Sequence, residues 1–534
     1  MPNDARAALA RLHERPDDDD AGDVLEHLLT AAPAQLYEAL LSAAPPPSGL
    51  GETRYRWTDH IAARVQNPAR FVRAASLADL VQAVTYARAH GLHVRAVGSG
   101  YSFSNVVATN GMLVDCAALD HVLPIDFGLR QGRPHERLFR FEAGIRMAKL
   151  NQVLDDLGLA LTNQASSDGQ TFAGYVATAT HGSGLAFGDG ASCIRSVRLV
   201  DGTGRVRQIE PTDGITDAAL FASQYPDVVL HQDDDQFYAT IVSMGSVGLF
   251  HSVVIGVRET FWLRESRKLS TWEEMKSTWR ADVRAHRHYE LLVSPYRNKG
   301  RQLCLVTRRD ELAPNEPHHP KGDGSRRNPL TQMAMQVKGL DEAMVSLSRI
   351  EPMLMTRLVE RALKGLADDE YVDKSFRVLR LGAAVMRAFS SEFALPLENA
   401  MIAAERLSGL AQEYAVRHRI VHTSPFAMRF VGASKGFMSP MYGADTCMIE
   451  LPFLEGTVGG RELLERYEEA LYPLGGRPHW GQLFHLSGGP ALVQQMYPRF
   501  DAFAATVAAL DPDGVFSNAF TRHLGLHTPA FKPW

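Results

Sequence analysis

The chain has 534 residues, with 56 Lys and Arg against 61 Asp and Glu, a formal net charge of -5 and four cysteines. Hydrophobic residues make up 45% and charged residues 22%, which excludes global disorder and is typical of a globular protein with two to four domains. The mildly acidic balance argues against nucleic acid as a partner, because neutralising phosphates requires a basic face.

The N-terminus and the cysteines indicate a cytoplasmic protein. The N-terminus lacks the basic start and the apolar core that identify a signal peptide, so none is expected. No window approaches the roughly 18 apolar residues of a membrane span. The cysteines are separated by tens of residues, so neither a disulfide framework nor a metal motif is expected. Reduced thiols are typical of the cytoplasm.

The first part of the chain predicts an appendage followed by a βαβ unit. Residues 1–50 read as short helices that end in the Pro/Ser/Gly-rich stretch 45–49. A strand at 71–74 precedes Ser76, an N-cap residue with Asp79 at the third helical position, and the helix should end at His90-Gly91. The next strand, 93–97, runs directly into a glycine-rich loop.

The rest of the chain changes character near residue 262. Before it, strands are predicted at 138–142, 196–200, 206–209 and 253–257, with a helix before Gly158. After it, residues 289–296 and 302–307 predict a hairpin about Asn298-Lys299-Gly300. Residues 331–418 are predicted to be helical, and strands resume at 427–431 and 447–451.

Two glycine-rich loops carry the chemistry. The first, 98–105, follows a strand and offers small residues whose backbone N–H groups suit a pyrophosphate. It lacks the Gly-Lys-Ser/Thr of a Walker loop, and no helix starts there as the dinucleotide fingerprint requires. The second, 166–184, has one formal charge and repeated hydroxyls, a composition that suits a large polar ligand. Its His181, taken alone, is more typical of a structural histidine.

The pair of loops resembles the FAD-binding domain of the vanillyl-alcohol oxidase superfamily, in particular its aldonolactone and alditol oxidase branch. Supporting matches are Gly245-Ser246-Val247-Gly248 and the C-terminal Pro478-His479-Trp480-Gly481. The likeness covers residues 56–262 well, residues 420–525 in patches, and the segment 308–420 not at all. It implies an α+β fold, in which a two-subdomain PCMH-type FAD-binding domain joins a substrate domain with an antiparallel sheet flanked by helices.

The resemblance also implies a division of the chain and a set of cofactor contacts. It divides the chain into an appendage (1–55), the FAD-binding domain (56–262), the substrate domain (263–475, with a helical insertion at about 308–420) and a C-terminal segment that returns to the flavin (476–534). The implied FAD-binding residues are Gly98, Ser99, Gly100, Tyr101, Ser102, Phe103, Thr171, Gly174, Thr178, Thr180, His181, Gly182, Ser183, Val253 and His479.

Four departures from the family pattern bear on the chemistry. Tyr101 stands where many relatives carry the histidine that bonds covalently to the flavin, and a phenol with a reference pKa near 10 is a poor nucleophile, so non-covalent FAD is expected. Packing is the more typical role for this tyrosine than catalysis. The Glu-x-Arg of the sugar oxidases reads Ala427-Met428-Arg429, their His-Trp-Gly-Lys ends in Gln482, and Glu450 replaces a neutral polar residue.

These changes predict an oxidase that acts on a CH–OH or related centre of a medium-sized, non-sugar or modified substrate, because a site that loses hydroxyl partners loses affinity for polyols. Arg429 would hold the substrate oxygen, Gln482 would lie near flavin N5, and Glu450 would be the base or, equally, a salt-bridged glutamate. The expected acceptor is O₂, giving H₂O₂. No metal is expected, and a homo-oligomer stays open. The alternatives are a flavin dehydrogenase, a tailoring enzyme acting on C–H or C–N bonds, and a flavin-fold binding protein without catalysis.

Overall fold

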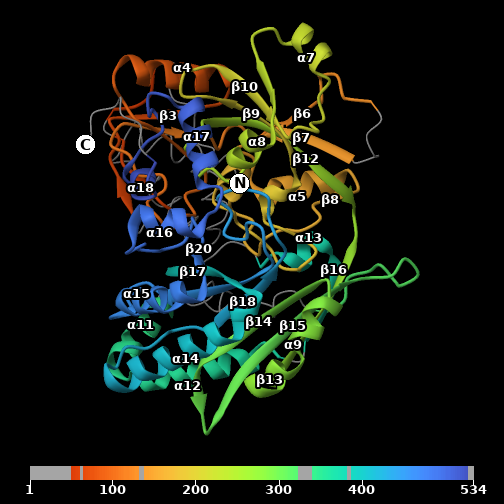
Figure 1. The fold of residues 1–534 in the computed structure, drawn as a ribbon. Helices are drawn as coiled ribbons and strands as arrows, with labels where there is room; N and C mark the ends of the chain where they lie inside the picture. Colours follow the sequence, from red (N-terminus) through yellow and green to blue (C-terminus); the bar gives the residue numbers. More distant parts are fainter. Residues whose placement is uncertain are drawn as a thin grey trace, which may run out of the picture. The chain divides into compact units, whose positions relative to one another are not determined.

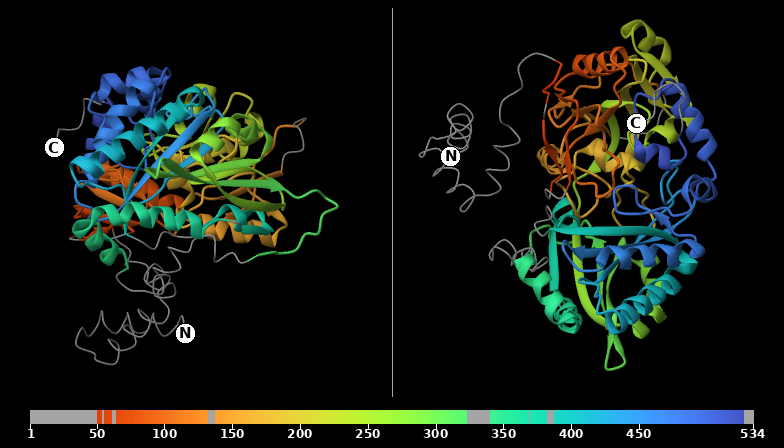
Figure 2. Two further views of the ribbon diagram at one scale, coloured as in Figure 1. Left: turned by 90° about the horizontal axis from the view of Figure 1, so that it is seen from below. Right: turned by 90° about the vertical axis from the view of Figure 1, so that its left-hand side faces the viewer.

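The computed structural model describes residues 50–53, 55–60, 64–131, 137–322, 340–367, 369–381 and 387–526. From Thr53 onward the chain forms one compact unit. The predicted appendage, residues 1–55, lies almost entirely outside the described residues. Figure 1 shows the described elements in chain order, and Figure 2 shows them from two further sides.

The predicted βαβ unit is present as a three-stranded parallel sheet in the order β3 (Arg70–Arg73), β5 (Met112–Asp115) and β4 (Val94–Val97). Helix α4 (Leu77–Ala89) crosses between β3 and β4. Its N-cap is Ser76, whose hydroxyl accepts a hydrogen bond from the Asp79 N–H at 3.2 Å, as the sequence predicts. Strand β4 ends immediately before the first glycine-rich loop, so this sheet fixes where that loop starts.

A larger sheet forms the second part of the cofactor half. Its strands lie in the order β11 (Val229–Gln232), β10 (Val206–Glu210), β9 (Ile194–Val200), β12 (Leu249–Glu259), β7 (Arg137–Glu142) and β6 (Val122–Leu123), with β8 (Leu159–Ala160) paired to β12. Helices α5 (Met147–Asp156), α6 (Phe172–Ala177), α7 (Ala218–Gln224) and α8 (Asp234–Thr240) join these strands. The short helix α6 lies inside the second glycine-rich loop.

An eight-stranded antiparallel sheet forms the substrate half (Figure 1). Its order is β16 (Asp369–Lys374), β13 (Trp262–Thr271), β15 (Arg301–Glu311), β14 (His288–Asn298), β18 (Phe426–Val431), β19 (Thr446–Leu454), β17 (Ala388–Pro396) and β20 (Arg477–Pro478). The predicted hairpin is β14–β15. Its turn residues Lys299 and Gly300 both have positive φ angles, as a two-residue hairpin turn requires.

The two faces of this sheet differ in chemistry. Met428, Ile449 and Phe393 are paired across β18, β19 and β17 and pack into one hydrophobic core. Helices that cover this face are α9 (Trp272–Ala285), α12 (Pro352–Gly365), α14 (Ala400–Arg417) and α15 (Gly460–Leu471). Since side chains alternate along a strand, the charged neighbours of these apolar residues point to the opposite face.

The prediction of an all-helical segment at 331–418 is wrong in two places. Helices α11 (Leu340–Ile350), α12 and α14 are present, with the short α13 (Ser375–Leu379), but β16 and β17 are strands. Strand β17 lies between β19 and β20 inside the sheet, so the segment supplies part of the sheet and is not only an insertion. Its residues are buried on both faces from Phe389 to Leu395, which hides the period-two alternation that identifies a strand.

The C-terminal segment returns to the cofactor half. Helices α16 (Gly489–Met496), α17 (Phe500–Leu510) and α18 (Ala519–His523) follow β20. The fully buried Trp480 belongs to the same hydrophobic cluster as Phe172 of the second loop. The Phe103 N–H donates a 2.6 Å hydrogen bond to the Gly481 carbonyl, and the Ser104 hydroxyl bonds the Trp480 carbonyl. The segment therefore braces the first loop directly.

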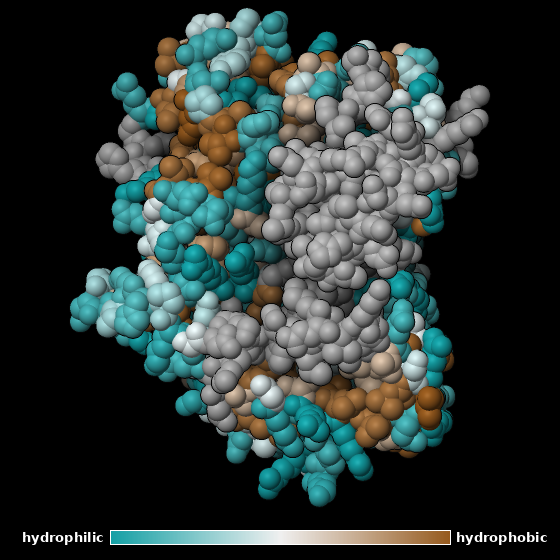
Figure 3. Space-filling view, turned by 180° about the vertical axis from the view of Figure 1, so that it is seen from behind, coloured by the Kyte–Doolittle hydropathy of each residue, from teal (hydrophilic) through white to brown (hydrophobic). Residues whose placement is uncertain are grey.

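The surface carries a mixture of polar and apolar side chains. Seen from behind, hydrophilic residues dominate the coloured part of the surface, with brown apolar patches between them (Figure 3). The most exposed large hydrophobic residues described are Ile350, Val416 and Val458. None of the described helices has the length and apolar character needed to cross a membrane. All four cysteines are free.

Candidate functional site

A deep cavity lies where the two glycine-rich loops meet the eight-stranded sheet. Most of its lining comes from residues 95–107, 165–181, 243–250 and, on the sheet side, 392–482, with Trp57, Cys116 and Gly144 in addition. The space within this lining measures about 1480 Å³, which includes a part that is open to solvent. Since the lining runs from the glycine-rich loops to the substrate sheet, a ligand bound there can contact both halves of the protein.

Close packing of the two loops builds the cofactor end of the cavity. A Cβ atom added to Gly98 would lie 2.0 Å from the Thr171 Oγ1 atom, so only glycine fits there. The buried Arg95 guanidinium donates hydrogen bonds to the backbone carbonyls of Val106, Gly245 and Phe516. These bonds tie the first loop, the turn before β12 and the C-terminal segment together.

Six buried polar atoms on the cavity residues have no hydrogen-bond partner among the described residues. They are Arg95 Nε, Ser99 Oγ, Ser167 Oγ, Gln170 Oε1, Ser243 Oγ and Gln482 Oε1. A buried polar atom without a partner costs about 1–3 kcal/mol, so such a concentration indicates a polar ligand that completes them. With the backbone amides of the loops, these hydroxyl and amide groups fit the phosphate, ribityl and ring-edge atoms of FAD.

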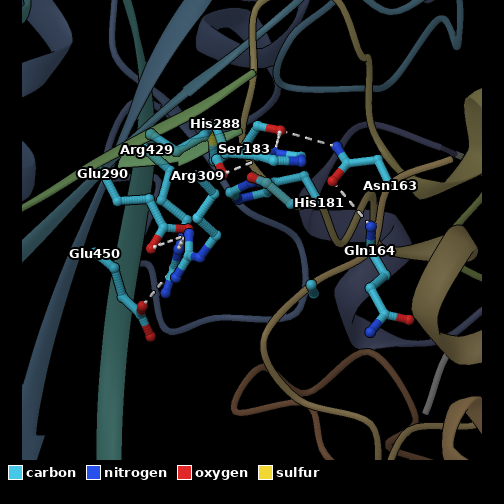
Figure 4. Close-up of polar contacts among 12 residues, drawn as sticks. Asn163, Gln164, His181, Ser183, His288, Glu290, Arg309, Arg429 and Glu450 are labelled. Atoms are coloured by element: carbon cyan, nitrogen blue, oxygen red, sulfur yellow. Dashed lines mark hydrogen bonds and ion pairs between the residues drawn. The ribbon is translucent and has the colours of Figure 1, made fainter. Parts of the chain in front are cut away.

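The sheet side of the cavity is built around Arg429. Its guanidinium Nη1 donates to the Glu450 carboxylate at 3.1 Å and lies 3.7 Å from Glu392, while Nε lies 3.6 Å from Glu290. Figure 4 shows Glu290, Glu450, Arg309 and Arg429 gathered together on the sheet side of the site. Burial would lower the pKa of Arg429, but the three carboxylates raise it instead. The arginine is therefore a permanent cation.

The Glu-x-Arg motif would place a carboxylate at residue 427, which is alanine here, and Glu450 lies directly opposite that residue. Ala427 and Glu450 are direct neighbours across β18 and β19, and both point to the same face as Arg429. The carboxylate that pairs with Arg429 is thus supplied one strand away. Burial raises the pKa of Glu450; Arg429 opposes this shift and Glu392 adds to it.

Glu392 joins the sheet to the second glycine-rich loop. One of its oxygens lies 3.1 Å from His181 Nε2, and both side chains are almost fully buried. Burial alone would raise the pKa of Glu392, but His181 and further cations lower it to about 2. Burial would lower the pKa of His181, but the Glu392 carboxylate outweighs burial and raises it. Each member of the pair therefore shifts the pKa of the other toward its charged form.

His479 completes this corner of the cavity as a neutral histidine. Burial lowers its pKa to about 4, and its Nδ1 accepts the Gly481 N–H at 3.1 Å. His181, Glu392 and His479 offer ligand atoms within 4.8 Å of one another, the spacing of a metal site. His181 Nδ1 lies 2.9 Å from the Gly182 carbonyl oxygen, His181 Nε2 contacts Glu392 and His479 Nδ1 accepts the Gly481 N–H, so we assign no metal to the cluster.

Tyr101 lies flat against His60. The two rings are 4.0 Å apart at an interplanar angle of 10°, and a Cβ at Gly169 would lie 2.1 Å from the tyrosine hydroxyl. The ring is therefore held between neighbouring groups at the cavity wall.

Most of the predicted site residues converge on this one cavity. The lining includes Gly98, Ser99, Gly100, Tyr101, Ser102, Thr171, Gly174, Thr178, Thr180, His181, Arg429, Glu450, His479 and Gln482. Phe103, Gly182, Ser183 and Val253 do not line it. Phe103 braces the C-terminal segment, and the Ser183 carbonyl lies 2.8 Å from the ring of His288. Val253 is buried in the core on β12, and Gly248 and Phe250 line the cavity in that region.

Sequence reasoning missed Glu392 and the polar residues Ser167, Gln170 and Ser243. Glu392 lies in the segment predicted to be helical, and its signal is a single acid in the otherwise apolar and hydroxyl stretch 388–396. A charge in a buried strand requires a partner, so this acid could have been marked as a candidate.

Family comparisons agree with this geometry. The model of the D-arabinono-1,4-lactone oxidase family matches residues 253–524, and that of an FAD binding domain matches residues 68–210. The first match alone covers more than half of the chain. The chain belongs to the D-arabinono-1,4-lactone oxidase family. The match also runs through residues 308–420, which the motif resemblance left uncovered, in agreement with the place of β17 in the sheet.

Full-length relatives include an L-gulono-1,4-lactone dehydrogenase of Mycobacterium tuberculosis, 28% identical over 88% of this chain and 98% of the relative. An alditol oxidase of a Streptomyces strain is 26% identical over the same shares. Among solved structures, cholesterol oxidase from B. sterolicum superposes with a TM-score of 0.69 at 12% identity, over 91% of this chain and 99% of that one, and shows a shared fold.

These findings confirm the expected superfamily and the α+β fold with a PCMH-like FAD-binding part and a separate, helix-flanked sheet. The protein is an FAD-dependent oxidoreductase of the aldonolactone and alditol oxidase type. Oxygen, oligomeric state and compartment stay predictions.

Proposed function

We propose that the protein oxidises a CH–OH group of a neutral, hydroxyl-rich small molecule of the aldonolactone or alditol class, with FAD as the electron acceptor. The observation that carries the proposal is the buried cluster of Arg429, Glu450 and Glu392 on the wall of the cofactor cavity. A cation flanked by carboxylates offers both donors and acceptors, which is the arrangement that several substrate hydroxyls require. The names of the two full-length relatives point to the same substrate class.

This proposal replaces the expectation of a non-sugar substrate. That expectation rested on the changes at Ala427, Gln482 and Glu450 taken together, above all on the absence of a carboxylate at Ala427. Because Glu450 supplies a carboxylate from the neighbouring strand, the site keeps its capacity for polar hydroxyl groups. The same argument disfavours a large apolar alcohol, which would place apolar atoms against the charged Arg429–Glu450 pair and leave the Gln482 amide oxygen without a partner in a buried site.

The chain's own residues divide the work of orientation and proton transfer. When bound, FAD supplies a two-electron acceptor that takes hydride from the substrate carbon. Arg429 is placed to donate hydrogen bonds to a substrate oxygen, and Glu450, with its raised pKa, is placed to accept the hydroxyl proton. Gln482 Oε1 can accept a hydrogen bond from the cofactor or from a further hydroxyl. Glu392, held ionised beside His181, keeps Arg429 oriented.

We further propose that FAD is held without a covalent bond. The histidine that would form that bond in many relatives is Tyr101 here, and its ring is packed flat on His60. A phenol has a reference pKa near 10 and is a weak nucleophile at neutral pH. The hydroxyl and amide groups of the cavity that have no hydrogen-bond partner are available to bind FAD without a covalent bond.

Anaerobic reduction of the flavin tests the substrate class. The purified protein should be yellow, and mixing it with a C5 or C6 alditol or an aldono-1,4-lactone should bleach the absorbance near 450 nm within seconds. Benzyl alcohol and a long-chain alcohol serve as apolar counterparts and should leave the absorbance unchanged. Rapid bleaching by the apolar alcohols alone would contradict the substrate class, and a colourless protein that cannot be loaded with FAD would overturn the function.

Admitting air to the bleached protein then decides the acceptor. Recovery of the yellow colour within seconds, with one H₂O₂ per substrate, supports an oxidase. Slow recovery in air but rapid recovery with a soluble dye supports a dehydrogenase.

A further inference from the structure

His181 stands between hydrogen-bond partners that require a proton on each ring nitrogen. Nδ1 lies 2.9 Å from the Gly182 carbonyl oxygen, which can only accept, so Nδ1 carries a proton. Nε2 lies 3.1 Å from a Glu392 oxygen. Arg429 lies 3.7 Å from that same oxygen and favours its ionised form, so Glu392 accepts from Nε2 as well. The geometry therefore gives an imidazolium.

The groups around His181 come from four elements and support this assignment. Glu392 on β17 is the direct partner, and Arg429 on β18 lies beyond it. Glu450 on β19 adds negative charge. His479, which follows β20, faces His181 with ring centroids 5.9 Å apart and is neutral. The shift of the His181 pKa above its ordinary value agrees with the geometry.

We propose that Glu392 keeps His181 charged and that this imidazolium is the fixed cation that sets the reduction potential of the bound flavin. The proposal depends on FAD in the cavity and is independent of the substrate proposed above. Here Glu392 is a positioning residue, because it acts through His181.

The location of His181 supports the role. The part of FAD that exchanges electrons must lie beside the substrate, and the cavity meets the substrate sheet at the end lined by His181, Glu392 and Arg429. The residue after His-Trp-Gly is Gln482, which has no charge, where the family pattern has a lysine. Among the residues that line the cavity, the other cationic side chains are Arg95, which donates to backbone carbonyls, and Arg429, which lies among three carboxylates, and both keep their charge when His181 is replaced.

The physical effect of such a charge has a definite sign. Reduction adds negative charge to the flavin ring, and a cation in a water-poor site stabilises the reduced form more than the oxidised form. His181 is about 4% exposed, so water screens it little. Loss of the imidazolium should therefore make the bound flavin harder to reduce.

The first experiment measures the reduction potential of the flavin by equilibration with reference dyes, without substrate. In His181→Asn we expect the equilibrium to shift about tenfold or more toward oxidised flavin, which corresponds to about 30 mV for a two-electron couple. Glu290→Gln is the matched control. It removes a carboxylate beside Arg429 that does not contact His181, and it should move the potential in the opposite direction.

Glu392→Gln separates the positioning role from a simple loss of charge. If Glu392 were only a nearby anion, its removal would raise the potential as in Glu290→Gln. If it holds the proton on His181, the imidazolium is lost with it and the potential does not rise. An unchanged potential in His181→Asn, or a rise in Glu392→Gln equal to that in Glu290→Gln, would overturn the proposal.

Nitrogen NMR of protein with ¹⁵N-labelled histidine gives a readout that needs neither substrate nor turnover. The His181 resonances, assigned by their absence in His181→Asn, should show two protonated nitrogens at pH 7.5 and only one in Glu392→Gln. A neutral His181 ring in the unmodified protein would contradict the proposal. Glu392→Asp, which keeps the charge, should retain the imidazolium and guards against a Gln variant that fails to fold. Because the protonation state can be read without FAD, a failure of the proposed function is distinguishable from a failure here.

Discussion

Arg429 is a single cation with three carboxylates beside it. Glu290 is shared with Arg309, at 2.9 Å, and Glu392 is shared with His181, so Glu450 is the carboxylate with the fewest cations around it. The pKa directions follow this order. Arg309 and Arg429 overcome burial and lower the pKa of Glu290 to about 2, whereas the pKa of Glu450 is raised by burial. Neighbouring carboxylates driven in opposite directions are the usual sign of an acid–base site.

Glu450→Gln tests the assignment of the proton acceptor. An acceptor must be ionised, so the rate of flavin reduction by substrate should be low at acidic pH and rise to a plateau as the pH passes the raised pKa of Glu450. In the Gln variant this acidic limb should disappear, and the limiting rate should fall by about 10²- to 10⁴-fold, the usual contribution of a general base. Stopped-flow reduction between pH 5 and 9 measures both effects.

Glu290→Gln serves as the matched control for this prediction. Glu290 also contacts Arg429, but it does not line the cavity. Its variant should keep the acidic limb of the profile. An unchanged profile in Glu450→Gln, or the loss of the limb in Glu290→Gln, would assign the proton to another group.

The residues that a motif identifies were predictable, and those placed by the sheet were not. Arg429, Tyr101 and Gln482 stand at motif positions and all line the cavity. The pairing of Glu450 with Arg429 depends on the register between β18 and β19, which a sequence does not state. Glu392 depends on β17 inserting between β19 and β20, a contact between segments far apart in the chain.

At the scale of elements, the two glycine-rich loops act as one unit because Gly98 and Thr171 leave no space between them. Gly98→Ala would drive a methyl group into the Thr171 side chain and push the loops apart. We expect FAD affinity to fall by about tenfold or more, since about 1.4 kcal/mol of lost binding already gives that factor. Fluorescence titration of the apoprotein with FAD measures the change.

Two further variants make the loop test specific. Gly98→Ala combined with Thr171→Ala removes the atoms that lie 2.0 and 2.7 Å from the new methyl group and should recover part of the affinity. Gly409→Ala lies on α14 with no atom within 4 Å and should leave the affinity unchanged. An equal loss in the single and double variants would show that the effect is not steric.

The elements divide into those with local signals and those without. Helix α4 has its N-cap and glycine stop, and the β14–β15 hairpin has its turn, so both were predictable. Strand β17 has seven consecutive buried residues and no alternation, so its type is decided by the sheet around it. Its misassignment to helix also made 308–420 look like an insertion, whereas it supplies a strand of the substrate sheet.

At the scale of the whole molecule, the cavity is lined by both the cofactor half and the substrate half of the chain. Its walls come from the first loop, the second loop, the turn before β12 and the substrate sheet, segments that span residues 57–482. The polar atoms left without partners there are a cost that the protein alone does not offset. A ligand that completes them joins both halves, so FAD should stabilise the fold as well as serve the chemistry.

Removal and return of FAD tests this view together with the non-covalent grip. Acid precipitation should release the flavin into the supernatant, because Tyr101 gives no covalent bond. A yellow pellet would contradict that prediction.

Apoprotein prepared by mild chaotrope and then given FAD at 100 times its dissociation constant should gain about 2.7 kcal/mol in free energy of unfolding, the mass-action gain for a ligand that binds only the folded state. Urea unfolding followed by tryptophan fluorescence measures the gain. FMN, which lacks the adenine half, is the control and should stabilise less, because it leaves the loop and β12 end of the cavity without partners. Equal stabilisation by FMN would show that this end of the cavity does not hold the cofactor.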